Sequence, residues 1–386
     1  MRPPGAPKAA LHVLGPSAGG IRVHVAELAR RTTALGWAPT VAAPAGVMDG
    51  VLDPARDGVE VVALGTTADW SARRLLGLRR TLAAAVDGYE LVHAHGLKAA
   101  VLTLSLRGSL GRSSRRSGRR RTPVVVTLHN DMVGTHTGIG ARLRAFAQRS
   151  LLRFADHVVF VSQADADANR RVVPDDRRTV MMSFAARPEP RAGRDDTRRR
   201  FGVEPDAPLV VVVARLHPQK DLGMFLRAFA ATRGRVRDAR AIVAGDGPQH
   251  EELLALRDQL GLTSSVEFIG ATDAAADLMA SADVVAISSR WEGGPIVAVE
   301  AMQLGAPVLM TDTGAVAELA RGPGAAVLVQ PGDVDGFAAA LTDLLVSPDR
   351  RTAVAGAGRA LAETEFDGAA LVHRIDRAYR RALARR

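Results

Sequence analysis

The sequence predicts an α/β protein made of two doubly wound domains, each built on a parallel sheet. Three observations lead to this fold class. The chain has 386 residues, which is more than a single hydrophobic core usually organises. Its first half alternates short apolar runs with amphipathic segments, a pattern typical of buried parallel strands separated by helices. The same alternation begins again after Ala207, so a second domain is expected to repeat the architecture of the first.

The stretch between the two series is rich in Pro, Arg and Asp and has little apolar content, which is typical of an interdomain linker. In the final segment, Leu371, Ile375, Tyr379 and Leu383 recur every four residues and predict an amphipathic helix that packs on a domain face. The expected order is an N-terminal domain over residues 1–186, a linker over 187–206, a C-terminal domain over 207–366 and the final helix over 367–386.

Composition excludes several classes of protein. The chain has no cysteine, so disulfide scaffolds, thiolate zinc sites, iron–sulfur clusters and cysteine nucleophiles are excluded. Its net charge of +10 favours an anionic partner such as a phosphate or an acidic membrane surface. Apolar runs are much shorter than the ~20 residues that span a bilayer, and the N-terminus lacks a secretory pattern. We therefore expect a cytoplasmic protein, peripheral at the inner face of the membrane if it contacts one.

A glycine-rich turn joins the first expected strand to the first helix, in GPSAGGIRVHVAEL. Gly19 and Gly20 would let a ligand approach the backbone amides at a helix N-terminus. The spacing differs from the GxGxxG fingerprint, so a nicotinamide enzyme is disfavoured. An ordinary turn that needs glycine for its backbone geometry is the alternative.

Histidines follow two further strands of the first half. His93 and His95 stand close behind ELV, and His129 follows VVVTL. Because parallel strands end at one edge of a sheet, we expect these side chains and Gly19 on one rim, where an imidazole can exchange a proton with a bound hydroxyl. A functional role is favoured for His129, and a structural hydrogen bond for His24, His93 and His95. No carboxylate accompanies them at helical ligand spacing, so no metal is assigned.

Two cations follow the first strand of the second half, in VVVVARLHPQKDLGMF. Arg215 and Lys220 lie in a loop between a buried strand and a helix, where they could neutralise a diphosphate leaving group without a metal ion. The alternative is a surface loop with solvated charges.

Two carboxylates stand in SRWEGGPIVAVEAMQLGAPVL. Glu292 precedes Gly293, Gly294 and Pro295, and because proline suits the first helical turn, a helix is expected to begin here with its free amides exposed to a ligand. Glu300 lies about two helical turns further on. A carboxylate in an apolar helix is costly unless it is paired, and the vicinal hydroxyls of a ribose or hexose are suitable partners. A buried salt bridge is the alternative.

In combination, these motifs resemble the retaining GT-B glycosyltransferases of glycosyltransferase family four over nearly the whole chain. The resemblance is carried, in order, by GPSAGGIRVHV, VHAHG, TLHND, ARLHPQKD, GDGP and EGGPIVAVEAMQLGAPV. It implies two Rossmann-like domains that face each other across a cleft. It also implies a nucleotide-sugar donor, UDP-linked before GDP-linked, and transfer to a hydroxyl acceptor such as a lipid or cell-envelope glycan precursor, with retention and with neither metal nor cofactor.

The resemblance also implies roles for the individual residues. Arg215 and Lys220 would bind the diphosphate, Glu300 the ribose hydroxyls and Glu292 the transferred sugar, while His129 would contact the sugar near the reacting carbon. The donor-binding set is completed by Gly19, Gly20, Gly293, Gly294 and Pro295, and the acceptor side by His24, His93 and His95.

The chain departs from the family pattern at three places. Gln219 stands where the family often has Glu, and Gly294 where a larger apolar residue is common. MMSFAARPEP replaces the common Asn-Gly turn before the linker. These differences bear on which donor is bound more than on whether the chain is active.

Two further stretches carry charge. The run from Arg112 to Arg121 predicts a solvated loop, with docking on an anionic membrane or a phosphorylated acceptor as a hypothesis. It has no interleaved aromatic residue, so no specific nucleic acid partner is expected. Asp333 and Asp335 in PGDVDGF open an expected helix and are interpreted as a helix cap rather than as metal ligands.

Two other functions remain open at this point. One is a nucleotide-sugar epimerase of the same fold, and the other is a non-catalytic nucleotide-sugar-binding protein. The joint presence of Arg215, Lys220, Glu292 and Glu300 favours a transferase over the non-catalytic alternative.

Overall fold

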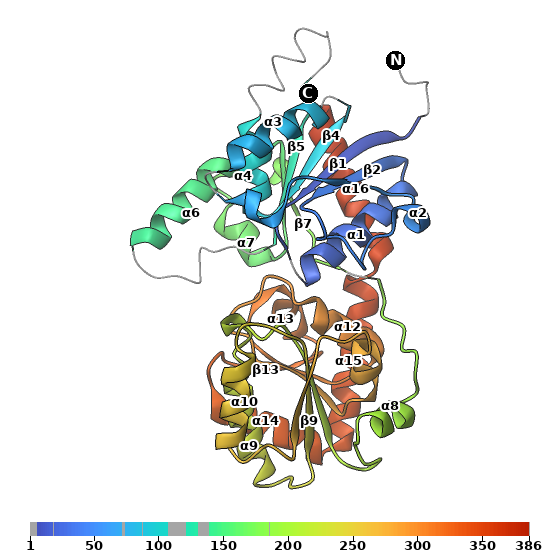
Figure 1. Ribbon diagram of the computed structural model, residues 1–386, viewed down its shortest axis with the longest axis vertical. Coiled ribbons are helices and arrows are strands. Elements are labelled where there is room, and N and C mark those ends of the chain that lie inside the picture. The colour runs from blue at the N-terminus through green and yellow to red at the C-terminus, as the bar shows by residue number, and fades with distance from the viewer. Residues whose placement is uncertain are drawn as a thin grey trace. The chain divides into compact units, whose positions relative to one another are not determined.

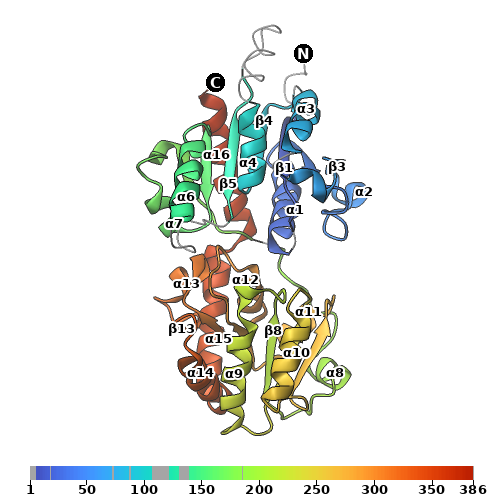
Figure 2. The ribbon, with the colours of Figure 1, turned by 60° about the vertical axis from the view of Figure 1, so that its left-hand side comes forward.

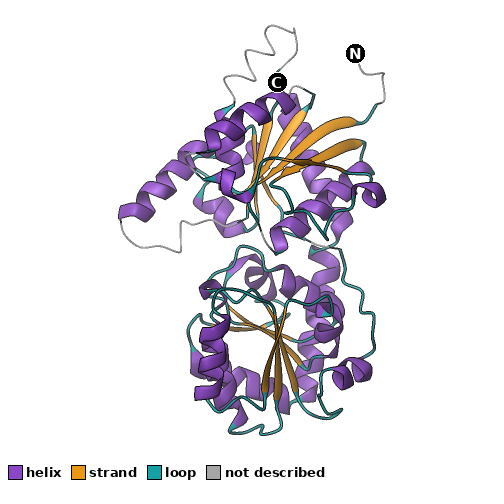
Figure 3. Ribbon diagram, viewed as in Figure 1, coloured by secondary structure: helices purple, strands orange, loops and turns teal. Residues whose placement is uncertain are grey.

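The computed structural model describes residues 6–17, 19–71, 74–86, 88–106, 121–129, 139–184 and 186–385. The chain forms two compact units. The first contains Met1–Ala185 together with Gly368–Arg386, and the second is Ala186–Asp367. Within each unit, strands lie between layers of helices (Figure 3). The predicted α/β class with two doubly wound sheets is confirmed.

The first unit has a parallel sheet in the order β3-β2-β1-β4-β5-β6-β7 (Figure 1). Its strands are β1 (Lys8–Leu14), β2 (Trp37–Ala43), β3 (Glu60–Ala63), β4 (Leu91–His95), β5 (Val124–Leu128), β6 (His157–Phe160) and β7 (Arg178–Val180). Its α-helices are α1 (Gly20–Thr33), α2 (Pro54–Asp57), α3 (Leu75–Val86), α4 (Leu97–Ser105), α6 (Ile139–Leu152), α7 (Gln163–Ala168) and α16 (Gly368–Ala384). Short 3₁₀ turns occupy Thr67–Trp70 and Asp175–Arg177.

Helices cover both faces of this sheet. Apolar residues of α3, α4 and α6 pack on one face, and those of α1 and α16 pack on the other. The predicted C-terminal helix is α16, and its buried Leu371, Ile375 and Tyr379 belong to the core of the first unit. Trp37 of β2 donates a hydrogen bond to Asp376 of α16 at 2.8 Å, which fixes the helix on the sheet.

The second unit has a parallel sheet in the order β10-β9-β8-β11-β12-β13. Its strands are β8 (Leu209–Val213), β9 (Arg240–Ala244), β10 (Val266–Gly270), β11 (Val284–Ile287), β12 (Val308–Thr311) and β13 (Val327–Val329). Its helices are α8 (Arg194–Arg200), the 3₁₀ turn Pro218–Lys220, α9 (Leu222–Arg233), α10 (His250–Gln259), α11 (Ala275–Ser281), α12 (Ile296–Leu304), α13 (Gly314–Ala320), α14 (Val334–Val346) and α15 (Pro348–Glu365). Helices α9 and α14 pack side by side over the apolar core (Figure 2).

The strand order of each sheet reverses direction next to its first strand. In the first unit the chain moves outward from β1 to β3 and returns to place β4 on the other side of β1. In the second unit β11 takes the equivalent place beside β8. Ligands of doubly wound folds bind at such switch points, outside the carboxyl ends of the strands. The topology therefore directs attention to the loops that follow β1, β4, β8 and β11.

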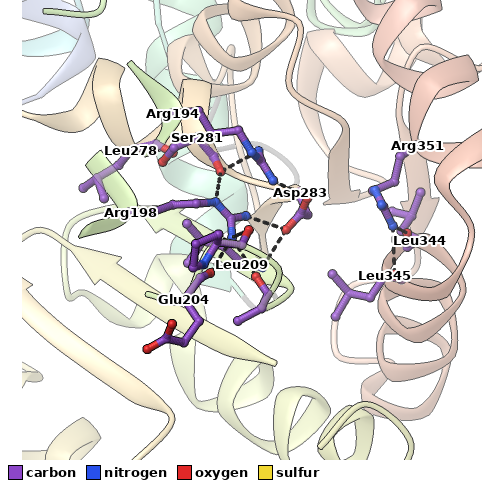
Figure 4. Close-up of polar contacts among 12 residues, drawn as sticks. Arg194, Arg198, Glu204, Leu209, Leu278, Ser281, Asp283, Leu344, Leu345 and Arg351 are labelled. Carbon is purple, nitrogen blue, oxygen red and sulfur yellow. Dashed lines mark hydrogen bonds and ion pairs between the residues drawn. The ribbon is translucent and has the colours of Figure 1, made fainter. Parts of the chain in front are cut away.

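Residues 187–206, expected as a linker, are built into the second unit. They contain α8, and the side chain of Arg198 on this helix is 1% exposed. Its guanidinium binds Asp283 at 2.7 Å and donates to the carbonyl oxygens of Glu204 and Ala207 at 3.2 and 2.7 Å (Figure 4). Low apolar content misled the prediction here, because a buried arginine network fixes this segment instead of apolar packing.

A second arginine of the same unit binds carbonyl oxygens at the end of a helix. Arg351, at the start of α15, donates to the carbonyl oxygens of Leu344 and Leu345 at 2.8 Å each (Figure 4). Because these carbonyls lie in the last turn of α14, they lack partners within their own helix. The predicted cap is confirmed at the other end of α14, where Asp333 accepts a hydrogen bond from the Gly336 amide at 2.9 Å.

Candidate functional site

The loops after β8 and β11 lie at the switch point of the second sheet and are bonded to each other. Gln219 donates to the carbonyl oxygen of Trp291 at 3.0 Å. The amide of Arg290 donates to the carbonyl oxygen of Gln219 at 2.8 Å, and Ser288 donates to the carbonyl oxygen of Lys220, also at 2.8 Å. All three bonds end on a backbone carbonyl oxygen, so the spacing between the two loops is fixed before any ligand binds.

This frame brings two of the predicted residues together. Lys220 forms an ion pair and hydrogen bond with Oε1 of Glu292, whose side chain is 7% exposed. Ser289 donates to the same oxygen at 2.6 Å. The other carboxylate oxygen, Oε2, makes no hydrogen bond to any residue that the structure describes. Glu292 is thus held by one oxygen, and the second remains available for a hydroxyl of a ligand.

Arg215 lies in the same loop as Lys220 but is exposed. Its guanidinium makes no hydrogen bond or ion pair with the described residues. The backbone on either side of it is tightly held, since the amides of Ala214 and Leu216 donate to Ala244 and Asp246 at 3.0 Å each. A Cβ atom on Gly247 would lie 2.4 Å from the Leu216 carbonyl oxygen, so the GDGP motif allows this close approach. The guanidinium of Arg215, which has no partner among the described residues, is therefore attached to a backbone segment that is held rigidly.

Glu300 lies on α12, in the helix that follows Glu292. It is partly buried, and burial raises the pKa of its carboxyl group to about 7. The carboxyl group has no hydrogen bond or ion pair within the described part of the chain. A salt bridge was the alternative to a ligand role, and the described residues provide none. A buried carboxylate without a protein partner is costly, and hydroxyl donors of a ligand would remove that cost.

If Glu300 binds the ribose of a nucleotide-sugar, as the resemblance implies, its raised pKa predicts that this binding depends on pH. Above pH 7 the group is a carboxylate that accepts two hydrogen bonds, and below pH 7 it takes up a proton. We expect the affinity for a nucleotide-sugar to fall by about tenfold for each pH unit below 7, because binding then has to displace that proton. Both phosphates of a nucleotide-sugar stay ionised throughout this range. Calorimetric titration from pH 5.5 to 8.5 measures the slope, which Glu300→Gln should abolish; an unchanged slope in that variant would assign it to another group.

Helix α12 begins as the sequence predicts. Pro295 occupies its N-cap position, and the helix has no acidic residue in its first turn. The loop before it is close to the start of α13, where the amide of Ala315 donates to the carbonyl oxygen of Gly293 at 2.9 Å. Gly314 has φ +76°, and a Cβ atom there would lie 2.7 Å from the Glu292 carbonyl oxygen. The sequence analysis missed Gly314, although a glycine just after a strand is a usable signal.

The glycine turn of the first unit is exposed. Gly19 has φ +72° and stands at the N-cap of α1, and Gly20 is the first residue of that helix. No side chain caps the helix, and its first turn has no acidic residue. The first amides of α1 are therefore not capped by a described side chain, and a ligand at this turn stays a prediction.

The histidines of the first unit need a correction. His93 and His95 were expected on one rim with His129 and Gly19, but both are buried, at 0% and 3% exposure, and His24 on α1 is buried at 0%. His93 lies within β4, where Tyr379 and Thr127 contact its two ring nitrogens at 2.8 and 2.7 Å. His93 lies inside β4 and contacts α16, His95 is the last residue of β4, and His24 lies on α1, so none of them stands in a loop behind the strand. The structural role favoured for these three agrees with the contacts, and a role on the acceptor side stays a prediction.

His129 follows β5 at the predicted place and is 4% exposed. Its Nδ1 lies 3.3 Å from Oγ of Ser183, and its Nε2 lies 3.4 Å from Nδ1 of His95. Both contacts are longer than the usual 2.9–3.0 Å. Catalytic hydrogen bonds are often long before the substrate binds and tighten in the complex. Contact with a sugar remains a prediction for this residue.

Ring nitrogens of the histidines form two groups in which a metal ion could be held. One group contains His12, His93 and His95, the other His24, His95 and His129, and within each group the atoms lie within 4.8 Å of one another. Several of these nitrogens are hydrogen-bonded to each other or to hydroxyl groups instead. The absence of a metal requirement stays a prediction.

The arginine-rich run lies outside the described residues except for Arg121, which pairs with Asp156. Its docking on a membrane or a phosphorylated acceptor therefore stays a hypothesis. In the part of the chain that the structure describes, no helix combines the length and the apolar character needed to cross a membrane.

Known proteins match both halves of the chain. The model of Glycosyltransferase Family 4 matches residues 18–181, and the model of Glycosyl transferases group 1 matches residues 193–361. A D-inositol 3-phosphate glycosyltransferase from Thermobispora bispora is 30% identical over 406 residues, covering 95% of this chain and 91% of the relative. The chain belongs to glycosyltransferase family four.

A second relative of this glycosyltransferase is a GDP-mannose-dependent alpha-(1-6)-phosphatidylinositol monomannoside mannosyltransferase from Mycolicibacterium smegmatis. It is 33% identical over 270 residues, which cover 65% of this chain and 67% of the relative. The match to the protein of the same name from Mycobacterium tuberculosis spans 47% of that relative. Among solved structures, Anabaena HepE in complex with UDP-glucose has a TM-score of 0.80 at 22% identity, over 96% of this chain and 99% of the other. This likeness confirms the GT-B fold.

Sequence reasoning missed several polar residues that contact the candidate residues within each unit of the glycosyltransferase. Ser289 holds Glu292, and Ser183 contacts His129. His12 and Tyr379 contact His95 and His93 from β1 and α16. Ser289 could have been found from its position at the end of a strand. Tyr379 could not, because it lies 286 residues from its partner.

Proposed function

We propose that the chain is a metal-independent, retaining glycosyltransferase that moves a sugar from a nucleotide-diphosphate donor to a hydroxyl acceptor. One observation carries the proposal. At the switch point of the second sheet, the exposed cation of Arg215, the Lys220–Glu292 pair and the carboxyl group of Glu300, which has no partner among the described residues, belong to loops and a helix of one rigid frame. A diphosphate, a sugar hydroxyl and a ribose match these three features.

The chemistry follows from what these groups stabilise. Transfer breaks the bond between the anomeric carbon and a phosphate oxygen, so negative charge develops on the leaving diphosphate. Arg215 and Lys220 would bind this charge more strongly in the transition state than in the bound donor, which is the differential stabilisation that lowers a barrier. The acceptor oxygen bonds to the same face of that carbon, and its proton passes to the leaving phosphate. Retention follows, and no further base is needed.

Glu292 and His129 would orient the sugar. The free Oε2 of Glu292 can accept a hydrogen bond from a sugar hydroxyl, while Lys220 and Ser289 hold Oε1 in place. His129 is assigned to the sugar near the reacting carbon, as the resemblance implies. Holding the reacting groups in one geometry contributes to rate in addition to charge stabilisation.

The relatives narrow the choice of substrates. UDP-linked donors were favoured from the sequence, and the mannosyltransferase relative makes GDP-mannose an equal candidate. Both relatives described above carry an inositol phosphate in the name of their substrate. We therefore place a hydroxyl of a phosphorylated inositol, free or lipid-linked, first among the acceptors.

A metal-free donor panel tests the function. Binding and slow hydrolysis of UDP-glucose, GDP-mannose and an ADP-sugar are measured in the presence of EDTA, for the wild type and for Lys220→Ala and Glu300→Ala. We expect one donor to bind, both substitutions to weaken it, and EDTA to leave the rate unchanged. Activity that appears only after a divalent cation is added back would contradict metal independence.

The acceptor assay separates the remaining alternatives. D-inositol 3-phosphate and phosphatidylinositol monomannoside are offered with the donor that binds, and the anomeric configuration of the product is determined by NMR. An α-linked product from an α-linked donor supports retention. A changed nucleotide-sugar formed without acceptor would indicate an epimerase, and tight binding without turnover a non-catalytic protein.

A further inference from the structure

Four residues of the first unit form a continuous chain of hydrogen bonds. Ser183 Oγ lies 3.3 Å from Nδ1 of His129, whose Nε2 lies 3.4 Å from Nδ1 of His95. Nε2 of His95 in turn lies 3.0 Å from Nδ1 of His12. His95 and His129 therefore each use Nδ1 toward one neighbour and Nε2 toward the other, in the same sense, while His12 uses Nδ1 toward His95.

The rings of this chain meet edge to edge. The planes of His12 and His95 differ by 12°, and their centroids lie 5.3 Å apart. The planes of His95 and His129 differ by 25°, with centroids 5.6 Å apart. The facing nitrogens are only 3.0 and 3.4 Å apart, which is much less than the distances between the ring centroids. The rings therefore approach each other through their nitrogen atoms and not through their faces. This is the geometry of a directed N–H···N hydrogen bond.

Such a chain couples the tautomers of its members. Burial lowers the pKa of His12 to about 3 and holds the pKa values of His95 and His129 well below their ordinary value, so each ring is neutral near pH 7 and carries one proton. Each N···N contact accommodates one proton. Only two arrangements satisfy both conditions, one with every proton on Nδ1 and one with every proton on Nε2.

His12, the last residue of this hydrogen-bond series, selects between the two proton arrangements. Nε2 of His12 is buried and makes no hydrogen bond within the described residues. A proton there would be a buried donor without an acceptor, which proteins avoid more strongly than an unused acceptor. The arrangement with every proton on Nδ1 avoids it. His129 then donates from Nδ1 to Ser183 and accepts from His95 at Nε2.

We propose that His12 and His95 are positioning residues that hold His129 in its Nδ1–H tautomer, so that His129 presents a hydrogen-bond donor to an oxygen of the bound sugar. The inference rests on the proposed function, because contact between His129 and the sugar is part of it. Oγ of Ser183 occupies the position that a sugar oxygen takes when the donor binds. The long 3.3 Å contact to Ser183 is the bond that is exchanged.

The tautomers can be observed without substrate. Long-range ¹⁵N–¹H spectra of the full chain labelled with ¹⁵N-histidine distinguish protonated Nδ1 from protonated Nε2, and signals are assigned by their loss in single variants. We expect His12, His95 and His129 all in the Nδ1–H form. An Nε2–H signature for His129 would overturn the proposal, whether or not the protein transfers sugar.

A matched pair of variants tests the coupling. Asn and Leu have nearly the same size, but the amide of His12→Asn can still donate to Nε2 of His95 from the place of Nδ1, and His12→Leu cannot. We expect His12→Leu to lower kcat on the order of tenfold at an unchanged KM for the donor, and to give His129 mixed tautomers. His12→Asn should restore both toward the wild type.

The control removes a buried histidine that is not part of this series of hydrogen bonds. His157 lies on β6 of the same sheet and contacts Oγ1 of Thr179 at 2.8 Å. His157→Leu should leave kcat and the His129 spectrum unchanged. Equal kcat values for His12→Leu and His12→Asn, or an unaltered His129 tautomer in His12→Leu, would contradict the inference. A wild type that turns over no donor contradicts the proposed function, and the spectra still decide the tautomer.

Discussion

Replacing Arg215 by alanine is expected to lower kcat/KM on the order of 10²-fold without changing the stability of the protein. The activity should fall because the guanidinium is assigned to the charge that develops on the leaving diphosphate, and the loss of one such preorganised donor costs that much in other enzymes. Stability should not change, because Arg215 is exposed and its side chain has no hydrogen bond or ion pair with the described residues. Steady-state kinetics and thermal unfolding measure the two effects.

The control for this prediction is an arginine of equal charge at the other end of the sheet. Arg237 is exposed and precedes β9, whereas Arg215 follows β8. Because the strands are parallel, these positions lie at opposite edges. Arg237→Ala should keep its kcat/KM near that of the wild type. A similar loss in both variants would mean that general charge attraction brings the donor to the protein, and the specific role of Arg215 would be wrong.

The sequence could predict that the loops after β8 and β11 lie together, because this depends on local patterns and simple topology. Strand periodicity located β8 and β11, and parallel strands that are neighbours end at one edge. Lys220 lies in the loop after β8 and Glu292 in the loop after β11, so placing them near each other required no knowledge of side-chain packing.

The histidine cluster shows where this reasoning ends. Its contacts depend on register, since His12 pairs with His93 across β1 and β4, and on α16, which returns to the first unit from the far end of the chain. Neither is encoded by spacing along the sequence. A histidine at a strand end also has the same local pattern whether it is exposed or covered. Local patterns along the sequence therefore predicted a rim where the structure has a buried hydrogen-bond network.

The segment 187–206 illustrates a different limit. Composition cannot separate a polar linker from a polar segment that is fixed by buried charges. Arg194 and Arg198 both bind Asp283, at 2.9 and 2.7 Å, and Asp283 also accepts from the Leu209 amide at 2.8 Å (Figure 4). The same carboxylate thereby joins α8 to the first strand of the second sheet. Residues 187–206 therefore contribute to the stability of the second unit and do not act as a flexible linker.

Replacing Arg198 by methionine is accordingly expected to destabilise the second unit by about 3–5 kcal/mol. Methionine fills much of the space of the arginine stem but leaves the carbonyl oxygens of Glu204, Pro205 and Ala207 without their buried donor. Unpaired buried acceptors carry the full cost of their desolvation. Urea unfolding of the full chain, followed by circular dichroism, measures the loss. Because the chain has two compact units, the data are fitted to two transitions.

The neighbouring Arg199 provides the matched control. Its side chain is 75% exposed and pairs with Asp196, which is 71% exposed. Arg199→Met should change stability by no more than about 0.5 kcal/mol, since exposed pairs contribute little. If Arg198→Met lost no more than Arg199→Met, residues 187–206 would behave as the linker that their composition predicts, and the network around Asp283 would contribute little to the fold. If only one transition moves, and it is the one that donor binding stabilises, the loss belongs to the unit that carries Arg215, Lys220 and Glu300.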